Sequence, residues 1–408
     1  MSTEQIVVVG GGHAAAALCA ALAEAGQGGR VHLVSAEHDL PYQRPPLSKS
    51  FLKKADEAIA PHKAAAWYAE QGIETHLGDP VEAIDREARV VLLRSGAALA
   101  YQHLVLATGT RARTLDALPP GLHNVHVLRN ASDARSLRTR LSEMVAAGRR
   151  LTVLGGGFIG LELAASARQL GLEVGVLEVA PRLLGRSVSA LLAEHVLAHH
   201  RSMGTEVQIG VRIDGFEIHE ERLISMQVNG GQVAVDELVL GIGAVPETRL
   251  ATACGLAVDN GVLVDACLRT SDPAVLAIGD CAAFLTVDGA RLRLESVQNA
   301  NDQARTAAAT LLGREEPYRA LPWFWSEQGP MRLQMAGLLP AQPETVRRAG
   351  ANASSFTLFH LQDGLLRCAE SVNAPMDHMM SRKLIEAGVP VERAALADPA
   401  ILLKSLLG

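Results

Sequence analysis

Two glycine-rich turns are the parts of this chain whose residue types and spacing indicate chemistry. They read GGGHAA at residues 10–15 and GGGFIG at residues 155–160. Each follows a short apolar run, Ile6–Val9 or Leu151–Leu154, and precedes an alanine-rich stretch with helical spacing. Glycines between a strand and a helix permit a tight turn and let the pyrophosphate of a dinucleotide approach the backbone at the helix N-terminus. Because the pattern occurs twice, the sequence predicts two dinucleotide sites.

An acidic residue follows the second turn at the spacing typical of a ribose-binding residue. Glu178 comes directly after the apolar run Val174–Leu177, 23 residues after Gly155. A carboxylate there accepts hydrogen bonds from the 2′-hydroxyl of NADH and repels the 2′-phosphate of NADPH. The sequence therefore favours NADH at the second turn. Arg182 and Arg186 follow, and they would reduce this discrimination if they faced the coenzyme.

Composition excludes several classes of protein. The 408 residues are nearly half apolar, which fits two or three domains, and the net charge of −6 with dispersed lysines and arginines argues against nucleic-acid binding. The chain starts without a leader-like segment and has no run of 18 apolar residues, so we expect a cytoplasmic protein that does not bind membranes. The five cysteines are odd in number and lack metal-site spacing, and we expect all five to be buried thiols.

The apolar runs after each turn indicate a duplicated fold. Tyr101–Thr110 and Asp236–Pro246 each combine a strand-like run with a glycine turn, and Ala274–Asp280 is a strand that we expect to return to the first domain. Beyond Pro322, short alternating runs predict antiparallel strands before a final helical stretch. The predicted fold is α/β, with two Rossmann-like dinucleotide-binding domains and a C-terminal α+β domain. The expected boundaries are 1–112 with 245–320 for the first domain, 113–244 for the second and 321–408 for the third.

Seven motifs in sequence order resemble one family. They are LPYQRPPLSKSFL, ATGTRAR, GGGFIGLELAA, LVLGIGAVPE, IGDCA, LESVQNA and PWFWSEQ. Together they resemble the FAD-dependent ferredoxin reductases of bacterial oxygenase systems, over nearly the whole chain. The resemblance implies a flavoprotein that accepts hydride from NADH and passes single electrons to a [2Fe-2S] ferredoxin serving an oxygenase. It leaves open whether the protein is a monomer or a weak homodimer.

The resemblance also assigns cofactor-binding residues. For FAD they include Glu37, which is expected to replace an acid that family members often carry at position 36. The alternative is that Glu37 is only a surface charge. Alanine stands at position 15, where a third glycine is common, and His13 is expected to be a solvent-facing loop residue. The full FAD set is Gly10, Gly12, Ala14, Ala15, Glu37, Arg44, Lys49, Val81, Ala107, Thr108, Gly109, Arg129, Asp280, Val297 and Trp325. The NAD(H) set is Gly155, Gly157, Ile159, Gly160, Glu178, Arg186, Ile242 and Gly243.

Two charged residues are implied to act in catalysis. In the family, Lys49 and Glu162 pair beside the flavin N5 atom, where a cation would stabilise the anionic reduced flavin. The alternative for Glu162 is an acid in the first turn of a helix, where the helix dipole favours it. Trp323 and Trp325 lie in the last motif, and one ring is expected to line the site while the other packs.

The acceptor is the least constrained part of the prediction. Related disulfide reductases carry a redox-active cysteine pair where this chain has PPLSK at residues 45–49, so electrons must leave to an external acceptor. A small acidic ferredoxin is expected to dock over the flavin edge, with Lys53 and Lys54 either on a basic rim or on a solvated helix face. Alternative acceptors are rubredoxin, a quinone, oxygen or a small organic radical. A rival of another class is a non-turnover NADH-sensing flavoprotein that resembles apoptosis-inducing factor.

Overall fold

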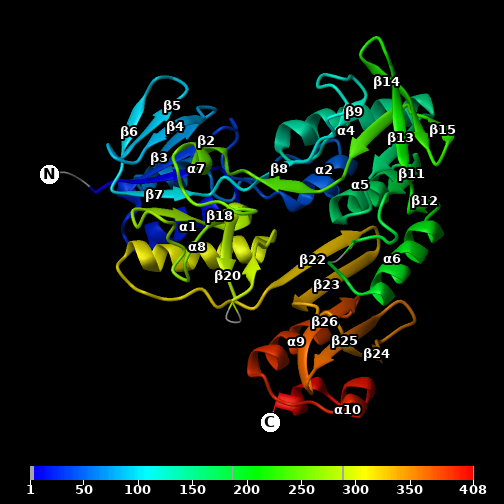
Figure 1. Ribbon diagram of the computed structural model, residues 1–408. Coiled ribbons are helices and arrows are strands. Elements are labelled where there is room, and N and C mark those ends of the chain that lie inside the picture. Colours follow the sequence, from blue (N-terminus) through cyan, green and yellow to red (C-terminus); the bar gives the residue numbers. More distant parts are fainter. Residues whose placement is uncertain (1–3, 186, 287–288, 408) are drawn as a thin grey trace. The chain divides into compact units, whose positions relative to one another are not determined.

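The computed structural model describes residues 4–185, 187–286 and 289–407, which form two compact units (Figure 1). Unit 1 holds the chain up to Arg44, together with Ala58–Arg111 and Ala244–Ala320. Unit 2 holds Pro45–Glu57, Ala112–Gly243 and the chain from Leu321 onward. Strands β8 (Thr110–Ala112) and β17 (Ala244–Pro246) lie where the chain passes between the units.

A five-stranded parallel sheet is the centre of unit 1. Its order is β19-β7-β1-β2-β3, with β1 in the middle and buried along its whole length. The continuous apolar run of β1 suits this position, because all four of its side chains are buried, as expected for a strand covered on both faces of the sheet. The strands are β1 (Ile6–Val9), β2 (Val31–Ser35), β3 (Glu74–Leu77), β7 (His103–Leu106) and β19 (Val275–Ala277). β19 pairs with β7, which confirms that this run returns to the first fold.

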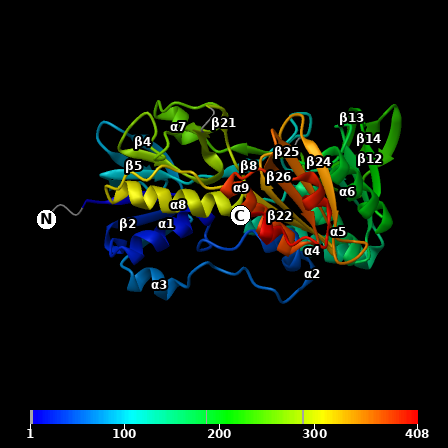
Figure 2. The same ribbon diagram turned by 90° about the horizontal axis from the view of Figure 1, so that it is seen from below.

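Helices and small sheets complete unit 1. Helix α1 (His13–Glu24) packs beside α8 (Val297–Leu311), as Figure 2 shows. The smaller helices are α3 (Ala65–Glu70) and α7 (Arg249–Ala253). The small sheets are formed by β4 (Val81–Asp85), β5 (Val90–Leu93) and β6 (Ala98–Ala100), and by β18 (Val262–Leu263), β20 (Ala282–Leu285) and β21 (Arg291–Leu292).

The first half of unit 2 repeats this design. Its parallel sheet has the order β12-β11-β10-β16-β9, and β10 takes the central place that β1 has in unit 1. The strands are β9 (Val125–His126), β10 (Arg150–Leu154), β11 (Glu173–Glu178), β12 (Glu206–Ile209) and β16 (Glu237–Leu240). The helices are α2 (Ser50–Lys53), α4 (Ala131–Ala147), α5 (Phe158–Gln169) and α6 (Ala190–Ser202). An antiparallel meander contains β13 (Ile213–His219), β14 (Arg222–Val228) and β15 (Gly231–Ala234).

The C-terminal part of unit 2 is an antiparallel sheet with helices, as the alternating runs predict. Its strand order is β22-β23-β26-β25-β24. The strands are β22 (Trp323–Gln328), β23 (Met331–Gly337), β24 (Glu344–Ala349), β25 (Phe356–Gln362) and β26 (Leu365–Val372). Helices α9 (Pro375–Ala387) and α10 (Arg393–Ala397) follow. Among the described residues, no helix is both long and apolar enough to cross a membrane.

The predicted α/β fold with two Rossmann-like sheets and a C-terminal α+β part is confirmed, whereas two local predictions are wrong. His13 is 8 % exposed and is the first residue of α1, because the helix begins immediately after Gly12. Cys254 is only partly buried, since it lies at the C-terminal end of the short helix α7, and the other four cysteines are buried as expected. The three-domain boundaries remain a proposal.

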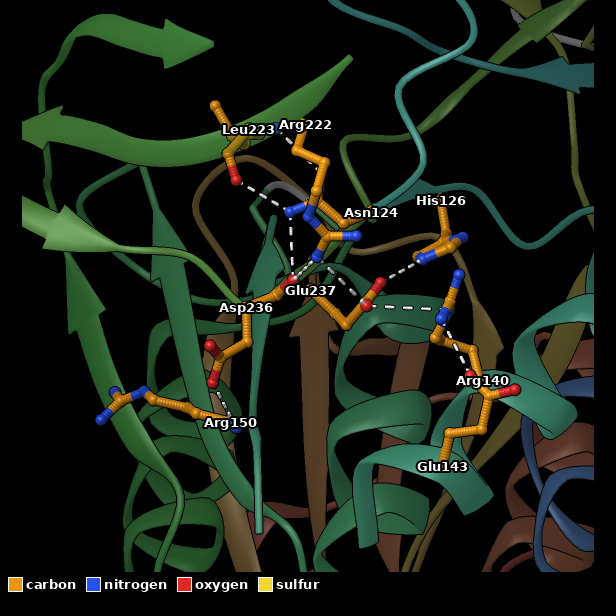
Figure 3. Close-up of polar contacts among 9 residues, drawn as sticks. All are labelled: Asn124, His126, Arg140, Glu143, Arg150, Arg222, Leu223, Asp236 and Glu237. Atoms are coloured by element: carbon orange, nitrogen blue, oxygen red, sulfur yellow. Dashed lines mark hydrogen bonds and ion pairs between the residues drawn. The ribbon is translucent and has the colours of Figure 1, made fainter. Parts of the chain in front are cut away.

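A buried carboxylate at the start of β16 anchors this strand of unit 2, and Figure 3 shows its polar contacts. Glu237 begins β16 and is fully buried. Its Oε2 lies 2.7 Å from Nε2 of His126, and its Oε1 lies 3.7 Å from Nε of Arg140 and 3.9 Å from an amino group of Arg222. These three partners come from the neighbouring strand β9, from α4 and from β14, so one side chain ties a helix and the meander to two strands of the sheet.

Replacement of this carboxylate is expected to destabilise the protein. Glu237→Gln should lower the free energy of unfolding by about 2–4 kcal/mol, because it removes the fully buried charge that pairs with Arg140 and Arg222 and accepts from His126. Glu143→Gln is the matched control, since Glu143 also pairs with Arg140 but is 57 % exposed and should contribute less than about 1 kcal/mol. Urea unfolding measures both variants, and equal losses would contradict the anchoring role.

Candidate active site

The turn between β1 and α1 is shaped to bring a ligand close to the backbone. Gly10 has a φ of +130°, and a Cβ there would lie 2.1 Å from the carbonyl oxygen of Ala107 at the end of β7. The next two residues differ in their space, because a Cβ at Gly11 would strike Ser35 whereas a Cβ at Gly12 would meet only Nε of Arg44, 4.0 Å away. The turn is therefore packed on one side and open at Gly12. The first turn of α1 carries no acidic side chain, so its N–H groups favour an anion.

Glu37 and Arg44 lie together beside this turn. Oε1 of Glu37 accepts a hydrogen bond of 2.6 Å from Arg44, and Oε2 accepts one of 2.5 Å from the hydroxyl of Tyr42. Ser35 ends β2 and corresponds to Glu178 in unit 2. The N–H of Gly10 donates to the carbonyl oxygen of Val34, just before Ser35, and the N–H of Gly155 donates to that of Leu177, just before Glu178. Glu37 is thus two residues beyond the strand end, held in place by an arginine and a tyrosine.

Other predicted FAD residues lie at the same edge of the unit 1 sheet. Ala107, Thr108 and Gly109 follow β7, and the Thr108 hydroxyl donates to the carbonyl oxygen of Glu247. Asp280 follows β19, next to Gly279, where a Cβ would lie 3.0 Å from the side chain of Ala14 in α1. The carboxyl ends of β1, β7 and β19 and the start of α1 therefore meet.

The remaining predicted residues of unit 1 are more varied in position. Ala15 is fully buried, Val81 is buried at the start of β4, and Val297 is the first residue of α8.

Burial raises the pKa of the Cys281 thiol, which adjoins Asp280, so this cysteine is neutral and not a thiolate nucleophile.

The turn between β10 and α5 repeats the first turn in unit 2. Gly155 has a φ of +111°, and a Cβ there would lie 2.4 Å from the carbonyl oxygen of Gly241, just after β16. A Cβ at Gly160 would lie 2.4 Å from the carbonyl oxygen of Gly155, whereas one at Gly157 would meet its nearest atom at 3.8 Å. Packing therefore requires glycine at position 160, whereas Gly157 leaves open space.

A cavity of about 870 Å³ adjoins this second turn. It is lined by the turn, by Glu178 at the end of β11, and by residues 241–243 after β16, so it lies at the carboxyl edge of the sheet, where parallel α/β sheets bind ligands. Glu178 accepts hydrogen bonds of 2.6 Å from the backbone N–H groups of Gly156 and Ala180, which hold its carboxylate at the cavity wall. Ile159 is 49 % exposed, and Arg186 lies outside the described residues.

Lys49 and Glu162 form an ion pair within unit 2. Nζ of Lys49 lies 2.5 Å from Oε2 of Glu162, and the Glu162 side chain is only 4 % exposed. The same oxygen accepts 2.6 Å from the Ser48 hydroxyl, and Oε1 accepts 2.7 Å from the Ser326 hydroxyl and 3.3 Å from the Glu327 N–H. Both carboxylate oxygens are therefore satisfied, which fixes the direction of the lysine ammonium group.

Glu162 does not lie in the first turn of its helix, so the alternative prediction for this residue is wrong. Helix α5 begins at Phe158, so Glu162 is its fifth residue and lies in the second turn, where no free N–H groups remain for it. Its negative charge is balanced by Lys49 and hydroxyl donors rather than by the helix dipole.

The tryptophans and Arg129 also belong to unit 2. Trp323 and Trp325 are partly buried on β22, with ring centroids 5.8 Å apart, and Ser326 follows them with its hydroxyl on Glu162. Arg129 lies just before α4, and its backbone N–H donates to the Asp133 carboxylate. Trp325 thus lies one residue from a residue that holds Glu162.

Sequence reasoning missed several residues of these two sites. Ser48 and Ser326 lie inside the quoted motifs PPLSK and PWFWSEQ, so the motifs themselves were the available signal. Tyr42 lies in the same motif as Arg44 and was overlooked as a partner of Glu37. Arg113 and Arg212 line the unit 2 cavity; Arg113 ends the quoted motif ATGTRAR, whereas Arg212 lies in none of the motifs.

The buried ion pair should show strong energetic coupling. A double-mutant cycle with Lys49→Met and Glu162→Gln is expected to give a coupling energy of about 1–3 kcal/mol, because the pair is shielded from water. The control cycle uses Lys54 and Glu57, whose charges lie 3.7 Å apart with the lysine 67 % exposed, and its coupling should stay below about 1 kcal/mol. Chemical unfolding gives both values, and similar coupling in the two cycles would refute the buried-pair description.

Comparisons with known proteins agree with this architecture. Residues 4–304 match the family model described as Pyridine nucleotide-disulphide oxidoreductase, and residues 323–407 match the model described as Reductase C-terminal. The chain is 41 % identical over 410 residues to the anthranilate 1,2-dioxygenase system ferredoxin–NAD(+) reductase component of Burkholderia cepacia, covering 100 % of both chains. It is 40 % identical over 402 residues to rhodocoxin reductase of Rhodococcus erythropolis, covering 98 % of this chain and 93 % of that protein.

Solved structures give the same result. A ferredoxin reductase from Rhodopseudomonas palustris superimposes with a TM-score of 0.94 at 39 % identity, covering 99 % of this chain and 100 % of that one. The covalent putidaredoxin reductase–putidaredoxin complex contains a chain that matches with a TM-score of 0.93 at 34 % identity, covering 100 % and 99 %. The protein is therefore a member of the pyridine nucleotide-disulphide oxidoreductase family.

Proposed function

We propose that this protein is an NADH:ferredoxin reductase that uses FAD and passes single electrons to a [2Fe-2S] ferredoxin serving an oxygenase. The observation that carries the proposal is the Lys49–Glu162 pair, whose lysine ends the PPLSK segment at residues 45–49, where related disulfide reductases are expected to carry redox cysteines. Cys368 is the single cysteine in the sequence of unit 2, and it is buried in β26. Electrons therefore have no internal disulfide to pass through and must leave to an external acceptor.

The residues of unit 1 fit FAD. The open backbone at Gly12, the acid-free start of α1 and the nearby Arg44 suit a pyrophosphate, and Glu37 offers a carboxylate to a ribose. We assign the other expected FAD residues of unit 1 to the same cofactor, with Asp280 at the end of β19. When bound, FAD supplies the chemistry that takes two electrons as hydride from NADH and releases them one at a time.

The residues of unit 2 are proposed to stabilise negative charge on the bound cofactor and to select the coenzyme. Lys49 holds a fixed positive charge, which favours negative charge on a group bound beside it, and Glu162 keeps that ammonium group from turning away. The unit 2 cavity receives NADH, with Gly157 open to the pyrophosphate and Glu178 facing the ribose. Val81, Arg129, Val297 and Trp325 are further contacts to FAD in this proposal, and Ile159, Arg186, Ile242 and Gly243 are further contacts to NADH.

The names of the relatives support the acceptor. The Burkholderia cepacia protein is a component of an oxygenase system, and one matched structure is a complex of a reductase with putidaredoxin. A reductase of rubredoxin, a quinone or oxygen would share the same sites, and so would a slow NADH sensor. We further propose a cytoplasmic protein that is monomeric or weakly dimeric.

Coenzyme selectivity tests the assignment of the unit 2 cavity. NADH should be preferred over NADPH by more than about tenfold in kcat/KM, because the Glu178 carboxylate repels a 2′-phosphate. Glu178→Ala should reduce this preference, measured by initial rates with each coenzyme. Glu173→Ala is the control, since Glu173 lies on the same strand at its exposed other end. Equal use of both coenzymes by the unmodified protein would refute this role of Glu178.

Acceptor specificity tests the function as a whole. NADH-dependent cytochrome c reduction should be stimulated strongly by an acidic [2Fe-2S] ferredoxin and should fall as salt increases, because charge attraction mainly sets the association rate. Lys53→Gln and Lys54→Gln together should weaken the salt dependence if these lysines belong to the docking rim. No stimulation by any ferredoxin, with fast direct reduction of a quinone or oxygen, would favour the small-molecule reductase. A long-lived reduced complex without turnover would favour the sensor.

A further inference from the structure

Three potential metal ligands meet on the sheet of unit 1, away from its glycine turn. His32 lies near the start of β2, and Glu74 and His76 lie on the neighbouring edge strand β3. The register pairs His32 with Glu74 directly, and His76 is two residues further along, so all three side chains project from one face. One imidazole or carboxylate atom of each residue lies within 4.8 Å of the other two.

The separations suit a bound ion. Nδ1 of His32 lies 3.2 Å from Nε2 of His76 and 3.3 Å from Oε2 of Glu74. Tetrahedral ligands at metal bonds of about 2.0–2.1 Å are about 3.3–3.4 Å apart, so two of the three separations already suit such a site, and the third is within 4.8 Å. The two imidazole rings are stacked, with centroids 5.5 Å apart and an interplanar angle of 26°.

The chemistry of the three side chains also suits a metal. The Glu74 side chain is 70 % exposed, which leaves the fourth position open to water and gives an ion a path from solvent. Two imidazoles and one carboxylate are typical of sites for zinc and its neighbours in the first transition row.

We propose that His32, Glu74 and His76 form a binding site for a divalent transition metal ion such as Zn²⁺. The ion would join β2 to the edge strand β3 and take water as its fourth ligand. The alternative is a hydrogen-bonded histidine pair with a nearby surface glutamate, which needs no ion. This site is separate from the cofactor turns, so the proposal does not depend on the proposed reductase activity.

Metal content and thermal stability test the proposal on the flavin-containing protein without an affinity tag. After incubation with a small excess of ZnCl₂ and gel filtration, elemental analysis should find about one Zn²⁺ per chain, and X-ray absorption should show imidazole and oxygen ligands. The Tm should rise with added Zn²⁺, because an ion that binds only the native state stabilises it. His76→Gln and Glu74→Gln should each weaken binding by at least about tenfold and reduce this rise.

Two controls keep the result interpretable. His219→Gln removes an exposed histidine of unit 2 and should bind Zn²⁺ like the parent. Glu74→Gln changes an exposed side chain at a sheet edge, so it should retain flavin absorbance and fold even if a histidine variant does not. Failure of the parent to retain stoichiometric Zn²⁺ would overturn the proposal. Equal binding by the parent and the Glu74 and His76 variants would also overturn it, because the ion would then lie elsewhere.

Discussion

The close approach of two glycine turns to the neighbouring strand is the constraint on which the rest of the structure depends. At Gly10 and at Gly155 the backbone adopts a positive φ, and a side chain would collide with the carbonyl group of the adjacent crossover strand. Only glycine satisfies both conditions without strain. This contact lets the helix start directly over the carboxyl edge of each parallel sheet, so each unit presents N–H groups to an anionic ligand.

The ion pair of Lys49 and Glu162 depends on a different kind of constraint. A buried carboxylate is costly unless its charge is compensated and its oxygens accept hydrogen bonds. Glu162 meets both conditions through Lys49, Ser48, Ser326 and the Glu327 N–H. The lysine ammonium group is fixed by the same network, so the positive charge that the proposed reaction needs is set by segments far apart in the sequence.

Local patterns predicted the fold well because they act over short distances. The apolar runs, the glycine turns and the alternation of the C-terminal strands each reflect contacts within a few residues, and the structure has strands and helices at these places. The partners of Glu162 could not be predicted from spacing, since Ser48 and Ser326 are 114 and 164 residues away. The burial of His13 was missed because the sequence does not reveal that α1 begins directly after Gly12. The partial exposure of Cys254 was missed because it depends on where a five-residue helix ends.

Flavin and coenzyme binding by two matched glycine variants tests the central claim most directly. Gly12 and Gly157 have ordinary negative φ values and open space where a side chain would project, so valine should be tolerated by the fold but should obstruct a pyrophosphate. Gly12→Val should purify with little or no FAD, as measured by visible absorbance. Gly157→Val should retain FAD and lose at least about tenfold in NADH affinity. Full FAD content in Gly12→Val together with unchanged NADH affinity in Gly157→Val would contradict the assignment of two dinucleotide sites.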